Sequence, residues 1–277
     1  MNKIKEKINL NLELTERILV DFIREEVRSA GFSKVVLGLS GGIDSAIVAF
    51  LAVKALGPEN VLGIMMPYKS SSKESLEDAQ RVIDKTGMRS KKIEITDMVD
   101  AYFAKEPDIS DMRKGNKMAR ERMTILYDYS AKENALVLGT SNKTEILLGY
   151  STQWGDSASA INPIGDLLKA QIWALSEYMG VPKEIIEKKP SADLWEGQSD
   201  EDELGFSYLL ADEIITCLVD ERYTKEEILE LGYSEKVVNS VIWRIKINQY
   251  KRKLPLIAKI SNRTIGREFR YPRDWGI

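Results

Sequence analysis

The sequence contains no histidine, and this absence excludes several kinds of active site. Without an imidazole there is no histidine general base, no Ser-His-Asp triad and no histidine-ligated metal. The chain also has a single cysteine, Cys217, which excludes a disulfide or a thiolate metal cluster within one chain. Because Cys217 lies in an apolar-rich run, residues 214–219, we expect it to be a small core residue.

A large excess of one charge and long apolar runs are also missing. The 40 basic side chains nearly balance the 43 acidic ones and aromatic residues make up only 8%, so nothing indicates nucleic-acid binding. No uninterrupted apolar run approaches the roughly 20 residues that span a bilayer, and the polar N-terminus lacks the apolar region of a signal peptide. We therefore expect a cytoplasmic protein that binds neither nucleic acid nor a membrane.

The 277 residues show instead an alternation of strand and helix patterns. Periodicity predicts helices over residues 13–30, 46–56, 73–86 and 116–134, and strands over residues 34–39, 61–66, 91–95 and 136–138. Strands that alternate with helices, and are apolar enough to be covered on both faces, predict an α/β fold with a doubly wound parallel sheet. From about residue 207 to residue 257 the pattern is helical only. We expect one domain over residues 1–277, with a helical C-terminal part.

The strongest functional signal is a turn rich in glycine and serine between the first predicted strand and the next helix. Its residues are Gly38, Leu39, Ser40, Gly41, Gly42, Ile43, Asp44 and Ser45. Small residues let the backbone approach an anion, and a helix N-terminus offers unpaired N–H groups and a favourable dipole. Ser40 and Ser45 would add hydroxyl donors, and Asp44 could hold Mg²⁺ against the same phosphates.

Two better-known phosphate motifs do not fit this turn. No Gly-Lys-Ser/Thr follows it, as a kinase-type P-loop requires, and the dinucleotide fingerprint has a different glycine spacing. The alternative is a tight turn that binds nothing. We favour a ligand site, because polar turns at the carboxyl edge of such a sheet usually face a ligand.

The segment Ser40-Gly41-Gly42-Ile43-Asp44-Ser45 resembles the pyrophosphate loop of the N-type ATP pyrophosphatases, which adenylate a substrate oxygen. Further segments resemble the ammonia-dependent NAD synthetases of that superfamily, in the same order along the chain. They are residues 114–123, 126–127, 138–145, 155–156, 162–164, 169, 189–195, 199–201 and 203–205, with a weaker echo at 250–252. The resemblance covers roughly residues 35–208 and implies an adenine nucleotide alpha hydrolase-like fold.

The resemblance implies that ATP activates the nicotinate carboxylate of deamido-NAD as an acyl-adenylate. Ammonia then converts it to the carboxamide, which yields NAD⁺, AMP and pyrophosphate in the last step of NAD biosynthesis. No protein nucleophile is needed, which suits a chain without histidine. Because an acyl-adenylate hydrolyses readily, water must be excluded, and residues 67–73 and 188–205 are the candidates for loops that close over the site.

The resemblance also assigns roles to single residues. Asp44 and Glu145 would ligate Mg²⁺. Thr140, Lys169 and Ser191 would contact ATP, with Asp44 and Lys169 also acting in catalysis.

The remaining implied roles concern the second substrate. Arg120 and Tyr250 would hold deamido-NAD, helped by Lys251 reaching across the interface of a homodimer. Asp156 would lie near the reacting carboxylate and the incoming ammonia. The apolar face of the helix predicted over residues 116–134 is the candidate dimer contact.

Each implied role has a simpler structural alternative. Arg120 and Arg122 could be solvated charges on a helix, Glu145 could cap the helix after the fourth strand, and Lys169 could be an ordinary surface lysine. The combination of segments favours the functional interpretation.

The chain departs from the family pattern at three positions. Gln153 replaces a frequent lysine, Ala160 an aspartate and Tyr250 a histidine. All three concern the dinucleotide substrate rather than ATP.

The sequence also bears on the nitrogen source and on two other functions. A glutamine amidase domain has no room in 277 residues that the synthetase match fills, so free ammonia, or a separate glutaminase, is the implied donor. Another amide or thiolation ligase with the same ATP loop, such as a tRNA-modifying enzyme, is disfavoured by the near-neutral charge and single cysteine. A sensor that binds nucleotide without catalysis is disfavoured by the retention of Asp44 and Glu145.

Overall fold

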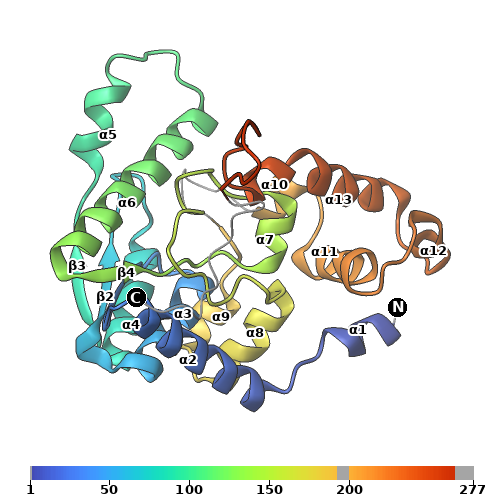
Figure 1. Ribbon diagram of the computed structural model, residues 1–277, viewed down its shortest axis with the longest axis horizontal. Helices are drawn as coiled ribbons and strands as arrows, with labels where there is room; N and C mark the ends of the chain where they lie inside the picture. Colours follow the sequence, from blue (N-terminus) through green and yellow to red (C-terminus); the bar gives the residue numbers. More distant parts are fainter. Residues whose placement is uncertain (1, 192–199, 266–277) are drawn as a thin grey trace.

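A parallel sheet forms the centre of the computed structural model, which describes residues 2–191 and 200–265 (Figure 1). In this part of the chain the strand order is β3-β2-β1-β4, and each neighbouring pair is parallel. The strands are β1 (Lys34–Gly38), β2 (Val61–Met65), β3 (Arg89–Lys92) and β4 (Ala135–Val137). The predicted doubly wound parallel sheet is confirmed.

Helices cover both faces of the sheet, as the apolar character of the strands requires. Val35 and Leu37 of β1 belong to a core shared with one set of helices, and Val36 between them belongs to a core on the opposite face. The helices of the first face are α2 (Leu12–Ser29), α3 (Ile43–Leu56), α4 (Lys73–Thr86), α8 (Lys169–Tyr178) and α9 (Lys183–Glu187). The helices of the second face are α5 (Thr96–Phe103) and α6 (Asp111–Glu133).

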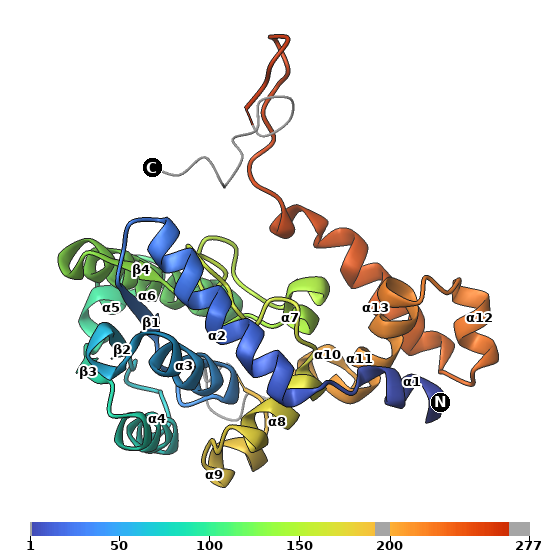
Figure 2. The same cartoon turned by 60° about the horizontal axis from the view of Figure 1, so that its bottom comes forward.

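A helical part with its own apolar core lies beside the sheet (Figures 1 and 2). The N-terminal helix packs into it against α11 and η2, so the start of the chain joins the C-terminal helices in one layer. Cys217 is fully buried there, as expected. The elements are α1 (Asn2–Ile8), α7 (Lys143–Leu148), α10 (Asp200–Leu204), α11 (Tyr208–Ile215), η2 (Thr216–Asp220), α12 (Lys225–Glu230), α13 (Glu235–Ile247) and η3 (Gln249–Arg252).

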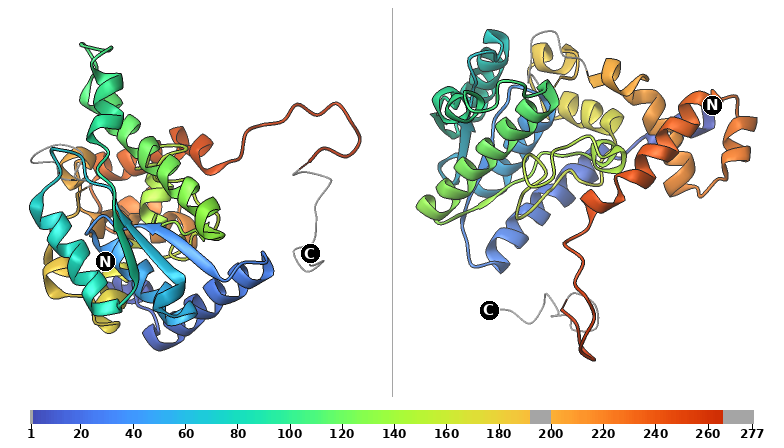
Figure 3. Two further views of the ribbon diagram at one scale, coloured as in Figure 1. Left: turned by 90° about the vertical axis from the view of Figure 1, so that its left-hand side faces the viewer. Right: turned by 90° about the horizontal axis from the view of Figure 1, so that it is seen from above.

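Two expectations about helices are corrected. The last helical turn, η3, ends at Arg252, so the helical pattern does not continue to residue 257. Residues 253–265, here called the C-terminal arm, run away from the body of the molecule (Figures 2 and 3). The apolar face of α6, expected as a dimer contact, is used within the chain, because Met118 and Ile125 are buried in the second-face core.

No helix among the described residues is long and apolar enough to cross a membrane.

The topology brings the predicted site residues to one edge of the sheet. In a parallel sheet all strands end at the same edge, and Ser40, Met66 and Thr140 each follow a different strand there. The chain after β4 adds α7 and α8, which carry Glu145 and Lys169. The site therefore lies where the sheet meets the helical part.

Candidate active site

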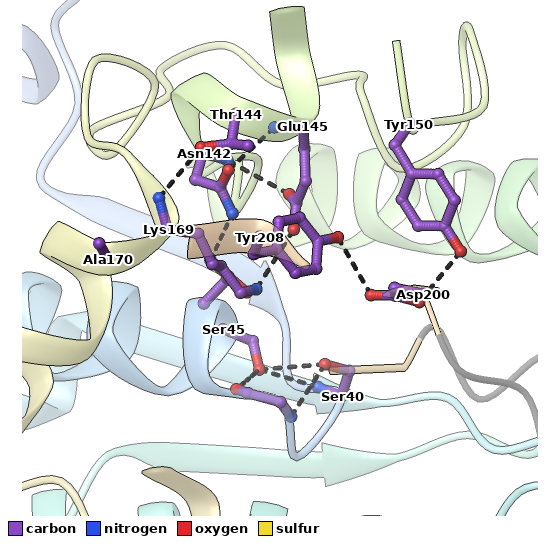
Figure 4. Close-up of polar contacts among 12 residues, drawn as sticks. Ser40, Ser45, Asn142, Thr144, Glu145, Tyr150, Lys169, Ala170, Asp200 and Tyr208 are labelled. Atoms are coloured by element: carbon purple, nitrogen blue, oxygen red, sulfur yellow. Dashed lines mark hydrogen bonds and ion pairs between the residues drawn. The ribbon is translucent and has the colours of Figure 1, made fainter. Parts of the chain in front are cut away.

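The glycine-rich loop joins β1 to α3 in a conformation that only its small residues permit. Gly41 has φ +81°, and a Cβ atom there would lie 2.1 Å from the Ser75 carbonyl oxygen at the start of α4. Ser45 Oγ donates to the Gly42 carbonyl at 2.9 Å and lies 3.1 Å from Ser40 Oγ (Figure 4). Ser45 is almost fully buried, so its hydroxyl braces the loop, whereas Ser40 lines the adjoining cavity.

One ammonium and two carboxylates meet next to this loop (Figure 4). Lys169 Nζ lies 2.5 Å from Asp44 Oδ2 and 3.3 Å from Glu145 Oε1. The Asn142 side-chain amide donates to Asp44 Oδ1 at 2.9 Å. The structure thus brings together Asp44, Glu145 and Lys169, which are separated by up to 125 positions in the sequence.

Burial changes how these groups hold protons. Burial, together with the neighbouring charge of Asp44, raises the pKa of Glu145 above its ordinary value, and the Lys169 ammonium opposes this shift. Burial would lower the pKa of Lys169, but the nearby Asp44 and Glu145 carboxylates raise it above its ordinary value. Lys169 therefore stays protonated, and a buried carboxylate pair of this kind favours a bound cation.

Two tyrosines and a further carboxylate surround Lys169 on the side of the helical part. The Lys169 ammonium lies 5.1 Å from the centre of the fully buried Tyr208 ring, a cation–π distance. The Tyr208 hydroxyl donates to Asp200 Oδ2 at 3.2 Å, and the Tyr150 hydroxyl donates to Asp200 Oδ1 at 3.0 Å. Burial raises the pKa of both phenols, so both remain neutral donors.

A cavity of about 480 Å³ opens beside the loop. One part of its wall is apolar and is formed by β2 and α6, including Ile64, Met66, Met123 and Leu126. Predicted site residues form much of the remaining wall. These are Gly38, Leu39, Ser40, Thr140, Asp156 and Lys251.

The far end of the cavity carries opposite charges from two segments. Asp156 Oδ1 accepts from the Thr152 backbone N–H at 2.8 Å. Lys251 Nζ donates to the carbonyls of Gly149 and Ser151, each at 2.7 Å. Lys251 thus contacts its own chain, and its reach across a dimer interface stays a prediction.

Other predicted residues lie outside the cavity wall. Tyr250 and Ser191 are exposed and Ile43 is a core residue, while residues 192–199 of the expected closing loop fall outside the described residues. Arg120 is exposed, and its guanidinium donates to the Gln153 carbonyl at 3.3 Å. Because that contact uses the backbone of residue 153, it does not depend on which side chain replaces the usual lysine.

Several residues at the site are not identified by any prediction from the sequence. Arg122, considered as a solvated charge, lines the cavity and donates from Nε to the Met66 carbonyl at 3.0 Å. Asn142 caps α7, and its backbone N–H is also bonded to Glu145 Oε2, so Glu145 takes part in the cap of this helix, while its role as a Mg²⁺ ligand stays a prediction. The spacing Asn-x-x-Glu before an apolar run was the available signal. For Tyr208 no local signal existed.

Comparisons with known proteins agree with this geometry. The family model described as NAD synthase matches residues 15–255. An NH₃-dependent NAD⁺ synthetase of Fusobacterium nucleatum is 59% identical over 255 residues, covering 92% of this chain and 99% of that protein.

Two solved structures are similar along most of their length. The NH₃-dependent NAD synthetase of Campylobacter jejuni, in complex with nitrate, has a TM-score of 0.78 at 38% identity, covering 91% of this chain and all of that one. The NMN synthetase of Francisella tularensis has a TM-score of 0.81 at 33% identity, covering 90% and 99%. The glycine-rich loop and the cluster of Lys169, Asp44 and Glu145 agree with these similarities. The chain therefore belongs to the NAD synthase family.

Proposed function

We propose that the chain amidates the nicotinate carboxylate of deamido-NAD with ammonia at the expense of ATP. It is a carbon–nitrogen ligase of NAD biosynthesis, and ATP is its co-substrate. The observation that carries the assignment of the site is the ammonium of Lys169 between Asp44 and Glu145, directly beside the glycine loop. Residues 1–277 would work as a single domain, and the enzyme would act in the cytoplasm.

ATP would lie between the glycine loop and the apolar wall. The wall of β2 and α6 suits a purine, and Thr140 and Arg122 offer donors at its edge. The loop N–H groups and the N-terminus of α3 would hold the phosphates, as helix N-termini hold anions. Ser191 would approach from the closing loop.

The residues present fit Mg²⁺. The Asp44 and Glu145 carboxylates converge on one positive charge, the Lys169 ammonium, at 2.5 Å and 3.3 Å. Mg²⁺ in phosphate sites takes one or two carboxylates together with substrate phosphates. When bound, Mg²⁺ would neutralise charge on the pyrophosphate that leaves. Lys169 would hold the same phosphates as a fixed charge.

The chemistry needs two displacements. An oxygen of the nicotinate carboxylate forms a bond to the α-phosphorus while the bond from that phosphorus to the bridging oxygen breaks, and pyrophosphate leaves. Ammonia then attacks the carbonyl carbon of the acyl-adenylate, AMP departs, and the nitrogen loses one proton. Asp156, which lines the cavity, would attract the ammonium ion and accept the proton that this ion loses when it becomes ammonia. The proton that the nitrogen loses when the amide forms would pass to water.

The second substrate would occupy the far end of the cavity. Lys251 would hold its phosphates, with Arg120 and Tyr250 at the outer rim. Gln153, Ala160 and Tyr250, where the chain departs from the family pattern, do not line the cavity.

We also propose a homodimer. The C-terminal arm exposes large apolar side chains that a single chain leaves in water, with Leu254 79%, Leu256 81% and Ile260 94% exposed. Such a patch marks an interaction site in a protein that stays in solution. A second copy of the chain is the partner that the family expectation supplies.

The first test is a coupled assay of NAD⁺ formation. The purified chain with Mg-ATP, ammonium and deamido-NAD should form NAD⁺, with little when glutamine replaces ammonium and none after chelation of the metal. Asp44→Ala should be inactive, whereas Asp166→Ala, which removes an aspartate whose side chain is 97% exposed, should retain activity. Binding of ATP without turnover of deamido-NAD would contradict the substrate assignment, and nicotinate mononucleotide would then be the first alternative, given the likeness to an NMN synthetase.

A further inference from the structure

The helix that carries Lys169 begins without a capping side chain of its own. Lys169 is the first residue of α8, and the residue before it is Leu168. The Leu168 side chain has no polar group that could accept from the first backbone N–H groups of the helix. Such N–H groups need an acceptor when they are buried, because an unpaired buried donor is costly. Acceptors for two of them come from distant parts of the chain.

Asp212 of α11 and Thr144 of α7 supply these acceptors. The Ala170 N–H donates to Asp212 Oδ2 at 2.7 Å, and the Lys169 N–H donates to Thr144 Oγ1 at 3.0 Å. The Thr144 hydroxyl in turn donates to Asp212 Oδ1 at 2.5 Å. Asp212 and Thr144 are fully buried, so water does not compete for these bonds.

We infer that Asp212 is a positioning residue for the reaction: its carboxylate fixes the first turn of α8 and, through Thr144, the start of α7. Lys169 stands on the first of these turns, and Glu145 directly follows Thr144 on the other. The buried Asp212 carboxylate therefore sets the distance between the Lys169 ammonium and the Glu145 carboxylate. The proposed function uses both of these groups, and this inference rests on that function.

Charge and placement distinguish this role from ordinary packing. A carboxylate at a helix N-terminus interacts favourably with the helix dipole and with backbone N–H donors. An apolar side chain could fill the same volume, but it would leave the Ala170 N–H and the Thr144 hydroxyl without partners. The next residue, Glu213, is also buried but bonds to the Tyr233 hydroxyl at 2.7 Å, away from Lys169, so it offers a matched control.

The test compares Asp212→Asn with Glu213→Gln in the full chain. We expect Asp212→Asn to lower kcat about 30-fold, with KM for deamido-NAD changed less than twofold, while Glu213→Gln keeps kcat within twofold of the wild type. Thr144→Val should lower kcat as Asp212→Asn does, whereas Thr144→Ser, which keeps the hydroxyl, should retain most of the wild-type rate. The double variant Asp212→Asn with Thr144→Val should lose less than the product of the two single losses.

A binding measurement separates this inference from the proposed function. Mg-ATP binding without a second substrate, followed by calorimetry, should weaken about tenfold in Asp212→Asn and stay unchanged in Glu213→Gln. If the wild type forms no NAD⁺ but this difference persists, the proposed function fails and the positioning role stands. The inference would be overturned if Asp212→Asn had the kcat and the Mg-ATP affinity of the wild type. It would also be overturned if Asp212→Asn and Glu213→Gln lost activity equally and in proportion to the fraction of protein that is unfolded.

Discussion

Single residues set the chemistry at the edge of the sheet. Lys169 is 2% exposed, and its ammonium is held by two carboxylates rather than by water. A buried charge of this kind costs free energy unless it is paired and hydrogen-bonded, so its partners are as necessary as the lysine itself. The same reasoning applies to Gly41, where the backbone has no room for a side chain.

Gly41→Ala should destroy the ATP site by displacing α4 from the glycine loop. The new methyl group would meet the Ser75 carbonyl oxygen at 2.1 Å, in addition to the cost of placing alanine at φ +81°. Gly31→Ala is the matched control, because Gly31 has the same φ but no atom within 4 Å of the new Cβ. Calorimetry of Mg-ATP binding should show a loss of at least tenfold for Gly41→Ala only. Equal affinities in both variants would contradict the argument.

Asp212→Asn should change stability in a way that depends on pH. Burial raises the pKa of Asp212 to about 6 from an ordinary 3.8, so its ionisation opposes folding: the cost is absent below pH 3.8 and complete above pH 6. Between pH 4.5 and pH 7.5 the wild type should lose about 2 kcal/mol of unfolding free energy relative to the variant. Urea denaturation at both pH values measures this difference. A difference that does not change with pH would show that the carboxylate titrates normally.

At the scale of elements, α4 connects the glycine loop to the segment that follows α9. The Ser75 carbonyl packs on Gly41, while the Lys188 ammonium bonds to Ser75 Oγ at 3.2 Å and to Asp78 Oδ2 at 2.9 Å. Asp78 is fully buried and also pairs with Arg81. One helix therefore contacts both the loop that would hold phosphates and the start of the proposed closing loop.

Lys188→Met should destabilise the fold by about 2 kcal/mol, because it removes one partner from a buried carboxylate while Arg81 remains. Lys189→Met, at the exposed neighbouring position, should change stability by less than about 0.5 kcal/mol. Urea denaturation of both variants at neutral pH is the measurement. If the two variants unfold alike, the Lys188–Asp78 pair does not hold α4 in place.

At the scale of the whole molecule, the helical part and the sheet share one site, and the C-terminal arm projects from the body (Figure 3). The arm contributes little to its own chain, because its large apolar side chains remain exposed. An arm of this kind is stable when a second chain covers it.

The combined variant Leu254→Ser, Leu256→Ser and Ile260→Ser should convert the proposed dimer to a monomer. Removal of three exposed apolar side chains takes away the area that association would bury, without loss to the core. Sedimentation velocity at micromolar concentration gives the readout, with Leu209→Ser, 53% exposed on α11, as the control that keeps the wild-type mass. A dimer in both samples would place the interface elsewhere.

Local signals in the sequence determined most of the elements. The predicted helix over residues 73–86 coincides with α4, because Ser72 caps its start and Gly87 adopts the left-handed conformation at its end. The glycine loop and the first two strands were equally readable, since turn chemistry and apolar runs act over a few residues. The predicted position of the third strand was wrong, because β3 is Arg89–Lys92 rather than residues 91–95. All four residues of β3 are exposed, so no apolar run in the sequence indicated this strand.

Tertiary structure alone decided which side chains meet. Thr144 and Asp212 are 68 positions apart, and Lys169 and Asp44 are 125 apart, so no local pattern could pair them. Arg122 faces the cavity rather than solvent because of how α6 lies on the sheet. Caps and periodicity depend on neighbours in the chain, whereas contacts between elements depend on the packing of whole faces. The sequence by itself therefore determined the elements, the loop and the family resemblance, while the geometry around Lys169 came only from the packing of the helical part against the sheet.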